Sequence, residues 1–190
     1  MNNSEEKQKM LAGELYNALD PLLIRERVNA RRLTRQYNLS TETELNKRNI
    51  ILKELLGKLS LGVYIEPDFR CDYGYNIFLG EGVFLNFGCV FLDVNTITIG
   101  DQTMVGPYVQ LYTATHPLDA EKRCEGPELG KSITIGSKCW IGGGVIINPG
   151  VNIGDNTTIG AGSVVTKDIP ANVFAAGNPC VVIKNLKNSE

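Results

Sequence analysis

The second half of the chain carries an aliphatic residue at every sixth position. The repeat runs without slippage through Ile135, Ile141, Ile147, Ile153, Ile159 and Val165. Most of these residues are followed by a small or turn-forming residue, which suits a backbone corner. The repeat therefore predicts that each hexapeptide forms a short strand and a turn, with its aliphatic side chain pointing inward. Three hexapeptides would close one triangular coil, and stacked coils would share a continuous core.

An earlier stretch follows the same period. It runs through Leu79, Leu85, Phe91, Ile99, Val105 and Leu111, with two extra residues between Phe91 and Ile99. Between Leu111 and Ile135 the period is lost in a polar segment, about residues 113–131, which contains His116. We expect this segment to leave the coil as one long inserted loop. Long loops on a rigid scaffold are where function tends to lie.

The first 60 residues follow a helical pattern instead. Leu11, Leu15 and Leu19 recur at four-residue spacing, which predicts one face of a helix. Asp20-Pro21 is typical of an N-cap followed by a first-turn proline. Thr41 and Glu44 match a capping box ahead of a leucine stripe. We therefore expect an N-terminal helical cap over 1–60, a β-helix domain over 61–184 and a C-terminal tail over 185–190.

Composition and charge narrow the function classes. The net charge of −2 argues against a nucleic-acid partner, since phosphate-tracking proteins carry a basic excess. The polar start contains no signal-peptide core, and nowhere do 18 apolar residues run together. We expect a cytoplasmic protein without a membrane partner.

The cysteines and the histidine restrict the chemistry. The five cysteines are odd in number and form no C-x-x-C pair, so we expect free thiols in a reducing compartment. His116 is the only histidine, which excludes zinc sites built on two or three histidines. We expect no metal to be required.

Four segments resemble the maltose/galactoside O-acetyltransferase family of hexapeptide-repeat acyltransferases, and its maltose branch most. They are Ala-Gly-Glu-Leu-Tyr at 12–16, Phe-Arg-Cys-Asp-Tyr-Gly-Tyr-Asn-Ile at 69–77, Tyr-Thr-Ala-Thr-His-Pro at 112–117, and the C-terminal repeats through Ala-Gly-Asn-Pro at 176–179. The resemblance covers nearly the whole chain. It implies a mainly β fold, a left-handed parallel β-helix, whose hand the spacing alone does not determine.

The resemblance also implies the reaction. Family members transfer the acetyl group of acetyl-CoA to a hydroxyl of a small sugar of the maltose, glucose or galactoside type. They work as homotrimers with each site shared by two subunits. His116 matches the catalytic histidine and would act as general base, since a neutral imidazole can accept the hydroxyl proton. Direct attack in a ternary complex is simpler than an acyl-enzyme.

Further residues match the family's binding positions. Asp72, Asn86 and Asp93 match positions that line the acceptor and acyl site, although Asn and Asp are also ordinary corner residues. The acetyl-CoA positions are Asn86, Trp140, Gly143, Ala161, Thr166, Lys167 and Lys184. Gly143 stands where a serine is common, and its backbone N–H could still serve as an oxyanion donor. Val181 replaces an arginine of some members, which could weaken CoA binding.

Several alternatives stay open at this point. The same fold could acetylate a non-sugar acceptor, or serve as a non-catalytic scaffold. The zinc-dependent carbonic anhydrases of this fold need three histidines, and this chain has one. Either Glu125 or Glu128 could orient His116, and Asp20 could contact the acceptor instead of capping a helix.

Overall fold

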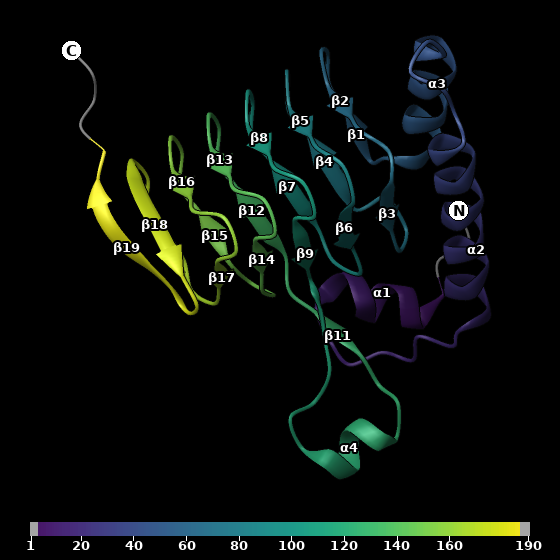
Figure 1. The fold of residues 1–190 in the computed structure, drawn as a ribbon. Coiled ribbons are helices and arrows are strands. Elements are labelled where there is room, and N and C mark those ends of the chain that lie inside the picture. The colour runs from purple at the N-terminus through teal and green to yellow at the C-terminus, as the bar shows by residue number, and fades with distance from the viewer. Residues whose placement is uncertain (1–3, 187–190) are drawn as a thin grey trace.

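The computed structural model describes residues 4–186 and confirms the expected fold class. The chain is mainly β and forms a left-handed parallel β-helix, with successive coils stacked along one axis (Figure 1). Three sheets form the faces of the prism. Residues 187–190 of the expected C-terminal tail lie outside the described residues.

The coils distribute their strands over the three sheets in turn. Sheet 1 contains β1 (Lys58–Leu59), β4 (Ile77–Leu79), β7 (Ile97–Ile99), β12 (Ile133–Ile135) and β15 (Asn152–Ile153). Sheet 2 contains β2 (Tyr64–Ile65), β5 (Phe84–Leu85), β8 (Met104–Val105), β13 (Trp140–Ile141), β16 (Thr158–Ile159), β18 (Val173–Gly177) and β19 (Cys180–Asn185). Sheet 3 contains β3 (Phe69–Cys71), β6 (Cys89–Leu92), β9 (Gln110–Tyr112), β14 (Ile146–Ile147) and β17 (Val164–Val165). We call the corners between sheets the 1–2, 2–3 and 3–1 edges.

The hexapeptide period places one aliphatic side chain above another inside the prism. Ile141 pairs with Ile159, and Ile147 pairs with Val165, each in a parallel register. The earlier repeat stacks in the same way, with Leu79 beside Ile99. These side chains belong to one buried cluster that runs through all the coils. Burying each of them contributes about 1.5–3 kcal/mol, so the period encodes the core.

Three helices precede the coils: α1 (Glu5–Ala12), α2 (Pro21–Asn38) and α3 (Leu45–Leu55). The Asp20 carboxylate accepts the N–H groups of Leu22 and Leu23, which confirms the predicted N-cap with Pro21 in the first turn. Helices α2 and α3 lie at the end of the stack formed by β1, β2 and β3 (Figure 1). They cover the first coil, and α2 packs against β3.

Two of the helical predictions were wrong. Leu11, Leu15 and Leu19 do not share a helix, because Gly13 ends α1 in the left-handed conformation with φ 77°. Leu15 and Leu19 are exposed. The predicted capping box is half present, since Thr41 donates its N–H to the Glu44 carboxylate at 2.8 Å. The helix nevertheless starts at Leu45, one turn later than a Thr41 N-cap requires.

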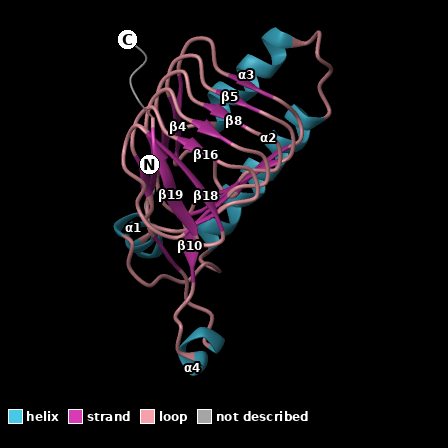
Figure 2. Cartoon of the chain, turned by 60° about the vertical axis from the view of Figure 1, so that its left-hand side comes forward, coloured by secondary structure: helices cyan, strands magenta, loops and turns pink. Residues whose placement is uncertain are grey.

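The inserted segment leaves the coil between Leu111 and Ile135, as expected, and it contains a hairpin. Strands β10 (Ala114–Thr115) and β11 (Leu129–Gly130) pair antiparallel, and the short helix α4 (Ala120–Cys124) closes the far end. The hairpin leaves the prism at the 3–1 edge and projects away from the coils (Figure 2). Within residues 4–186, no helix has the length and apolar character that a membrane span requires.

Candidate active site

His116 lies where the inserted hairpin leaves the prism, one residue after β10. Its Nδ1 is 3.2 Å from the main-chain carbonyl oxygen of Pro127, on the returning arm of the same hairpin. A carbonyl oxygen can only accept a hydrogen bond, so Nδ1 carries the proton in the neutral ring. The Nε2 lone pair is then available to accept a proton. This is the arrangement that a general base requires.

A pocket of about 330 Å³ adjoins this histidine. Charged side chains from three segments meet in it: Arg27 and Arg31 of α2, Asp72 after β3, and Glu128 of the hairpin. The remaining lining residues are Ala18, Leu19, Tyr73, Leu92, Val94 and Ala114. The pocket therefore combines a base with hydrogen-bond donors and acceptors, which suits a small hydroxylated molecule.

A second, smaller core fixes the relative position of cap and hairpin. It contains Met10, Tyr16, Ala18 and Leu23 of the cap together with Tyr73 and Val94 of the 3–1 edge. The backbones of Tyr16 and Glu128 exchange two hydrogen bonds, and the buried Tyr16 hydroxyl donates to Glu128 Oε2 at 2.7 Å. The carboxylate of Glu128 thus binds the Tyr16 hydroxyl, whereas the group that binds the ring nitrogen of His116 is the carbonyl of Pro127. Glu125 lies exposed at the end of α4, on the far part of the hairpin.

The two predicted acceptor carboxylates have different surroundings. Asp72 is half-buried in the His116 pocket, and burial raises its pKa despite the nearby Arg27. Asp93 is fully buried and accepts three backbone N–H groups, from Asp72, Tyr73 and Gly74, at 2.7–2.9 Å. Burial raises the pKa of Asp93 to about 7, and the N–H donors oppose this rise. Asp93 therefore holds the backbone that presents Asp72 to the pocket.

The predicted acetyl-CoA residues lie on several parts of the prism. Asn86, Gly143 and Ala161 occupy the 2–3 edge on the second, fourth and fifth coils. Thr166 and Lys167 lie at the 3–1 edge, after β17. Trp140 is on sheet 2 with 56% of its surface exposed, and Lys184 is on β19. None of these residues lines the His116 pocket of the same chain.

Sequence reasoning missed Arg27 and Arg31. Arg27 donates to the Tyr73 hydroxyl and to the carbonyl oxygen of Ala18, both at 2.6 Å, and thereby ties α2 to the pocket wall. Both arginines lie on the same face of α2 because they are four residues apart. That spacing was the available signal in the sequence. Asp20, by contrast, uses its carboxylate for the N-cap of α2 and for the Ser4 hydroxyl.

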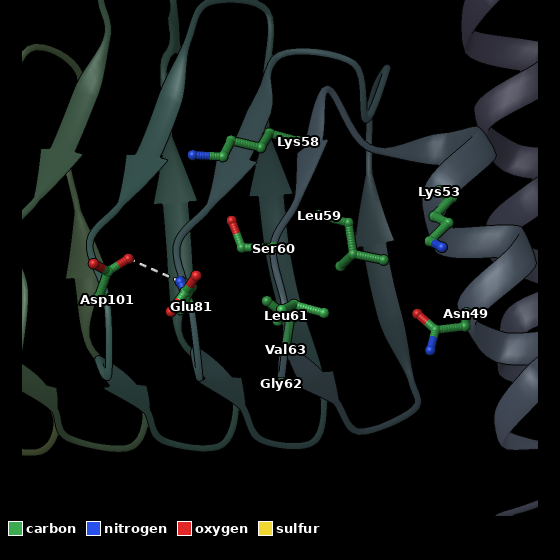
Figure 3. Close-up of a pocket in the computed structure, with 10 residues that line it drawn as sticks. All are labelled: Asn49, Lys53, Lys58, Leu59, Ser60, Leu61, Gly62, Val63, Glu81 and Asp101. Carbon is green, nitrogen blue, oxygen red and sulfur yellow. Dashed lines mark hydrogen bonds between the residues drawn. The ribbon is translucent and has the colours of Figure 1, made fainter.

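A larger pocket, of about 630 Å³, lies between α3 and the 1–2 edge (Figure 3). Its walls hold Lys53, Lys58, Glu81 and Asp101, with Glu81 donating its backbone N–H to Asp101. It contains none of the residues that the sequence singled out. Among residues 4–186, no three His, Cys, Asp or Glu side chains gather as a metal site would require.

Comparison with known proteins identifies the family. Residues 9–60 match the maltose acetyltransferase hexapeptide capping motif, and residues 132–167 match the bacterial transferase hexapeptide model. The chain is 53% identical to the solved maltose O-acetyltransferase of Clostridium difficile 630, with a TM-score of 0.96 over 98% of this chain and 100% of that one. The chain belongs to the maltose/galactoside O-acetyltransferase family. This confirms the resemblance of the four sequence segments.

Two further relatives of this chain support the same family assignment. The galactoside O-acetyltransferase of Escherichia coli is 40% identical over 96% of this chain and 90% of its own length. A hexapeptide-repeat acetyltransferase of Vibrio cholerae, solved in complex with acetyl coenzyme A, is 36% identical, with a TM-score of 0.91 over 97% and 100% of the two chains. The protein is accordingly an acetyl-CoA-dependent acetyltransferase.

Proposed function

We propose that this acetyltransferase moves the acetyl group of acetyl-CoA to a hydroxyl of a small sugar of the maltose, glucose or galactoside type. The observation that carries the proposal is the Nδ1 hydrogen bond of His116 to the Pro127 carbonyl, beside a pocket lined by Asp72, Arg27 and Glu128. Sugar hydroxyls both donate and accept hydrogen bonds, so carboxylates and guanidinium groups suit them. Two relatives of the chain, a maltose O-acetyltransferase and a galactoside O-acetyltransferase, support a sugar acceptor.

In the proposed mechanism, Nε2 of His116 takes the proton of the sugar hydroxyl while its oxygen attacks the thioester carbonyl carbon. The backbone N–H of Gly143 stabilises the oxyanion that develops. The carbon–sulfur bond then breaks, and the imidazolium returns the proton to the thiolate. The products are the acetylated sugar and free CoA, with no acyl-enzyme between them.

Three of the proposed acetyl-CoA residues lie at a different edge of the prism from His116, which favours a site shared with a second subunit. Asn86, Gly143 and Ala161 follow the 2–3 edge, whereas His116 and Asp72 lie at the 3–1 edge of the same chain. A homotrimer would bring the 2–3 edge of one subunit beside the 3–1 edge of the next. Exposed apolar side chains on sheet 2 and the 2–3 edge support such a contact: Phe87, Met104, Tyr108 and Trp140. Trp140, Thr166, Lys167 and Lys184 would then contact the CoA portion.

We place the enzyme in the cytosol, where thiols stay reduced, because Cys71, Cys89, Cys124, Cys139 and Cys180 are all free.

Release of free CoA thiol from acetyl-CoA tests the proposed reaction, with maltose, glucose, a galactoside and glucosamine offered separately as acceptors. His116→Ala should lower turnover about a hundredfold or more, whereas Glu121→Gln at the tip of the hairpin should not. Full turnover in His116→Ala would overturn the mechanism, and release driven only by a non-sugar acceptor would overturn the sugar assignment.

A further inference from the structure

A groove of about 490 Å³ runs between α2 and β3, and three arginines line it. Arg31 and Arg35 come from one face of α2, and Arg70 comes from the outward face of β3. Asp68 is the one carboxylate in the lining, so three guanidinium groups face one carboxylate. The groove is therefore basic, on a chain whose net charge is −2.

The guanidinium groups of these arginines have no direct partner within the described fold. Among residues 4–186, none of the three side chains takes part in a hydrogen bond or an ion pair of the structure. Other arginines of the cap are engaged: Arg27 binds the Tyr73 hydroxyl, and Arg32 binds Glu54 at 2.8 Å. A helix and a strand bring these three exposed guanidinium groups to one groove, where they can bind an oxyanion bidentately.

The groove adjoins the His116 pocket, because Arg31 lines both. The helix α2 is the common wall. Arg27 meets Tyr73 beside the pocket, and Asn38 binds the backbone of Phe69 at the far end of the groove. Arg35 lies two turns beyond Arg27, about 12 Å along the helix axis. A molecule with one unit in the pocket can therefore reach the arginines with its next unit.

Position along the stack separates the groove from the proposed acetyl-CoA residues. The groove lies on the first coil, whereas the residues proposed for CoA, Asn86 apart, follow from β13 onward. His116 comes between the two. An anion bound in the groove would thus belong to the acceptor and not to CoA.

We propose that this arginine groove (Arg31, Arg35 and Arg70) is an acceptor subsite for an anionic group, a carboxylate or a phosphate, on the unit next to the acetylated sugar. The inference rests on the proposed sugar acetyltransferase function. Arg35 and Arg70 do not line the His116 pocket, so we expect them to act on acceptor affinity and not on the reacting atoms.

The test compares acceptors that share one glucose unit. Maltose and maltitol are neutral, maltobionate carries a carboxylate on the second unit, and maltose 1-phosphate carries a phosphate there. The anionic acceptors should have a KM at least tenfold lower than the neutral ones. Raising the salt from about 0.05 M to 0.5 M should reduce this advantage, since screening weakens exposed charge pairs. Whichever anion shows the larger advantage identifies the preferred group.

Variants assign the effect to the groove. Arg35→Gln and Arg70→Gln should raise the KM of the anionic acceptors to that of the neutral ones, with the change in KM and not in kcat. Arg32→Gln, on the same helix but paired with Glu54, should leave all four acceptors unchanged. Equal KM values in the wild type would overturn the proposal, as would an advantage that survives in Arg35→Gln.

Two further measurements distinguish the subsite from a failure of the proposed function and from an interface between copies. Calorimetric titration of maltobionate and maltitol, with CoA present, reports acceptor binding without turnover. Tighter binding of maltobionate supports the groove even if no acetyl transfer occurs, in which case the proposed function fails alone. Sedimentation of the variants checks the assembly. If Arg35→Gln or Arg70→Gln changes the oligomeric state, the arginines serve an interface between copies and the subsite is wrong.

Discussion

Nδ1 of His116 lies 3.2 Å from the carbonyl oxygen of Pro127, so a backbone group holds the ring of the candidate base. The backbone carbonyl therefore fixes the orientation of the ring relative to the pocket. The two partners are 11 positions apart in the sequence, so the structure of the hairpin determines the tautomer.

The tautomer can be observed directly. His116 is the only histidine, so a long-range ¹⁵N–¹H spectrum of the uniformly labelled protein contains the signals of one imidazole. We expect the proton on Nδ1 at a pH where the ring is neutral, because the Pro127 carbonyl accepts it. His116→Gln provides the blank spectrum. A proton found on Nε2 would contradict the proposed role of that nitrogen as the base.

The Tyr16 hydroxyl should matter for turnover as well as for stability. Tyr16→Phe removes the donor to Glu128 and leaves a half-buried carboxylate without that partner, which should lower the free energy of unfolding by about 1–3 kcal/mol. It should also lower kcat more than it changes KM, because Pro127 adjoins Glu128.

Tyr37→Phe is the matched control for that variant. Tyr37 of α2 is equally buried and donates its hydroxyl to the carbonyl oxygen of Ile65 in β2, outside the hairpin. Urea unfolding of Tyr37→Phe should show a similar loss in the free energy of unfolding, whereas kcat should not change. If both variants lose turnover in proportion to stability, Tyr16 has no positioning role.

Asp93 should make stability depend on pH. Its pKa is raised to about 7 in the folded chain and lies near 3.9 in an unfolded one, so the folded state holds the proton to higher pH. The contribution of Asp93 to the free energy of unfolding is therefore complete below pH 4 and falls as pH rises toward 7. The slope is at most about 1.4 kcal/mol per pH unit.

Urea unfolding at pH 5, 6, 7 and 8 measures this slope. The Asp93→Asn variant should lack it, and should be less stable because its amide nitrogen faces a backbone N–H. Identical pH profiles of wild type and variant would show that Asp93 is not the titrating group.

Two adjacent glycines of the 2–3 edge should respond differently to alanine. A Cβ on Gly142 would lie 2.5 Å from the backbone nitrogen of Ala161 on the next coil, so the stack itself would have to move. We expect Gly142→Ala to cost about 1–3 kcal/mol. A Cβ on Gly143 would lie 3.2 Å from Pro107, which small shifts relieve, so Gly143→Ala should cost less. Thermal or urea unfolding compares the two, and equal losses would contradict the stacking argument.

The hexapeptide period alone was enough to predict the core, because each buried aliphatic is set by its place in the repeat and not by distant contacts. Ile141 and Ile159 are an example, as is the N-cap at Asp20, which needs only neighbouring residues. The helix predicted through Leu15 failed, since Gly13 terminates α1 and the spacing alone does not show this.

The site was harder to predict for a physical reason. The sequence singled out His116, but its partner Pro127 becomes adjacent only when β10 and β11 pair. Arg31 reaches the pocket only because α2 packs along β3. Such contacts depend on how separate elements dock, and no local pattern records them.

The C-terminal end of α2 helps to terminate the stack of parallel coils. The Asn38 side-chain amide donates to the carbonyl oxygen of Phe69 at 2.9 Å and accepts its N–H at 3.0 Å, as a neighbouring strand would. At the opposite end, β19 runs antiparallel to β18, so it offers no template for another parallel coil. Parallel coils with open ends invite the addition of further chains, as in amyloid growth. The helical cap at one end and the reversed strand direction at the other both interrupt the parallel stacking, which favours a finite length for a fibre-like architecture.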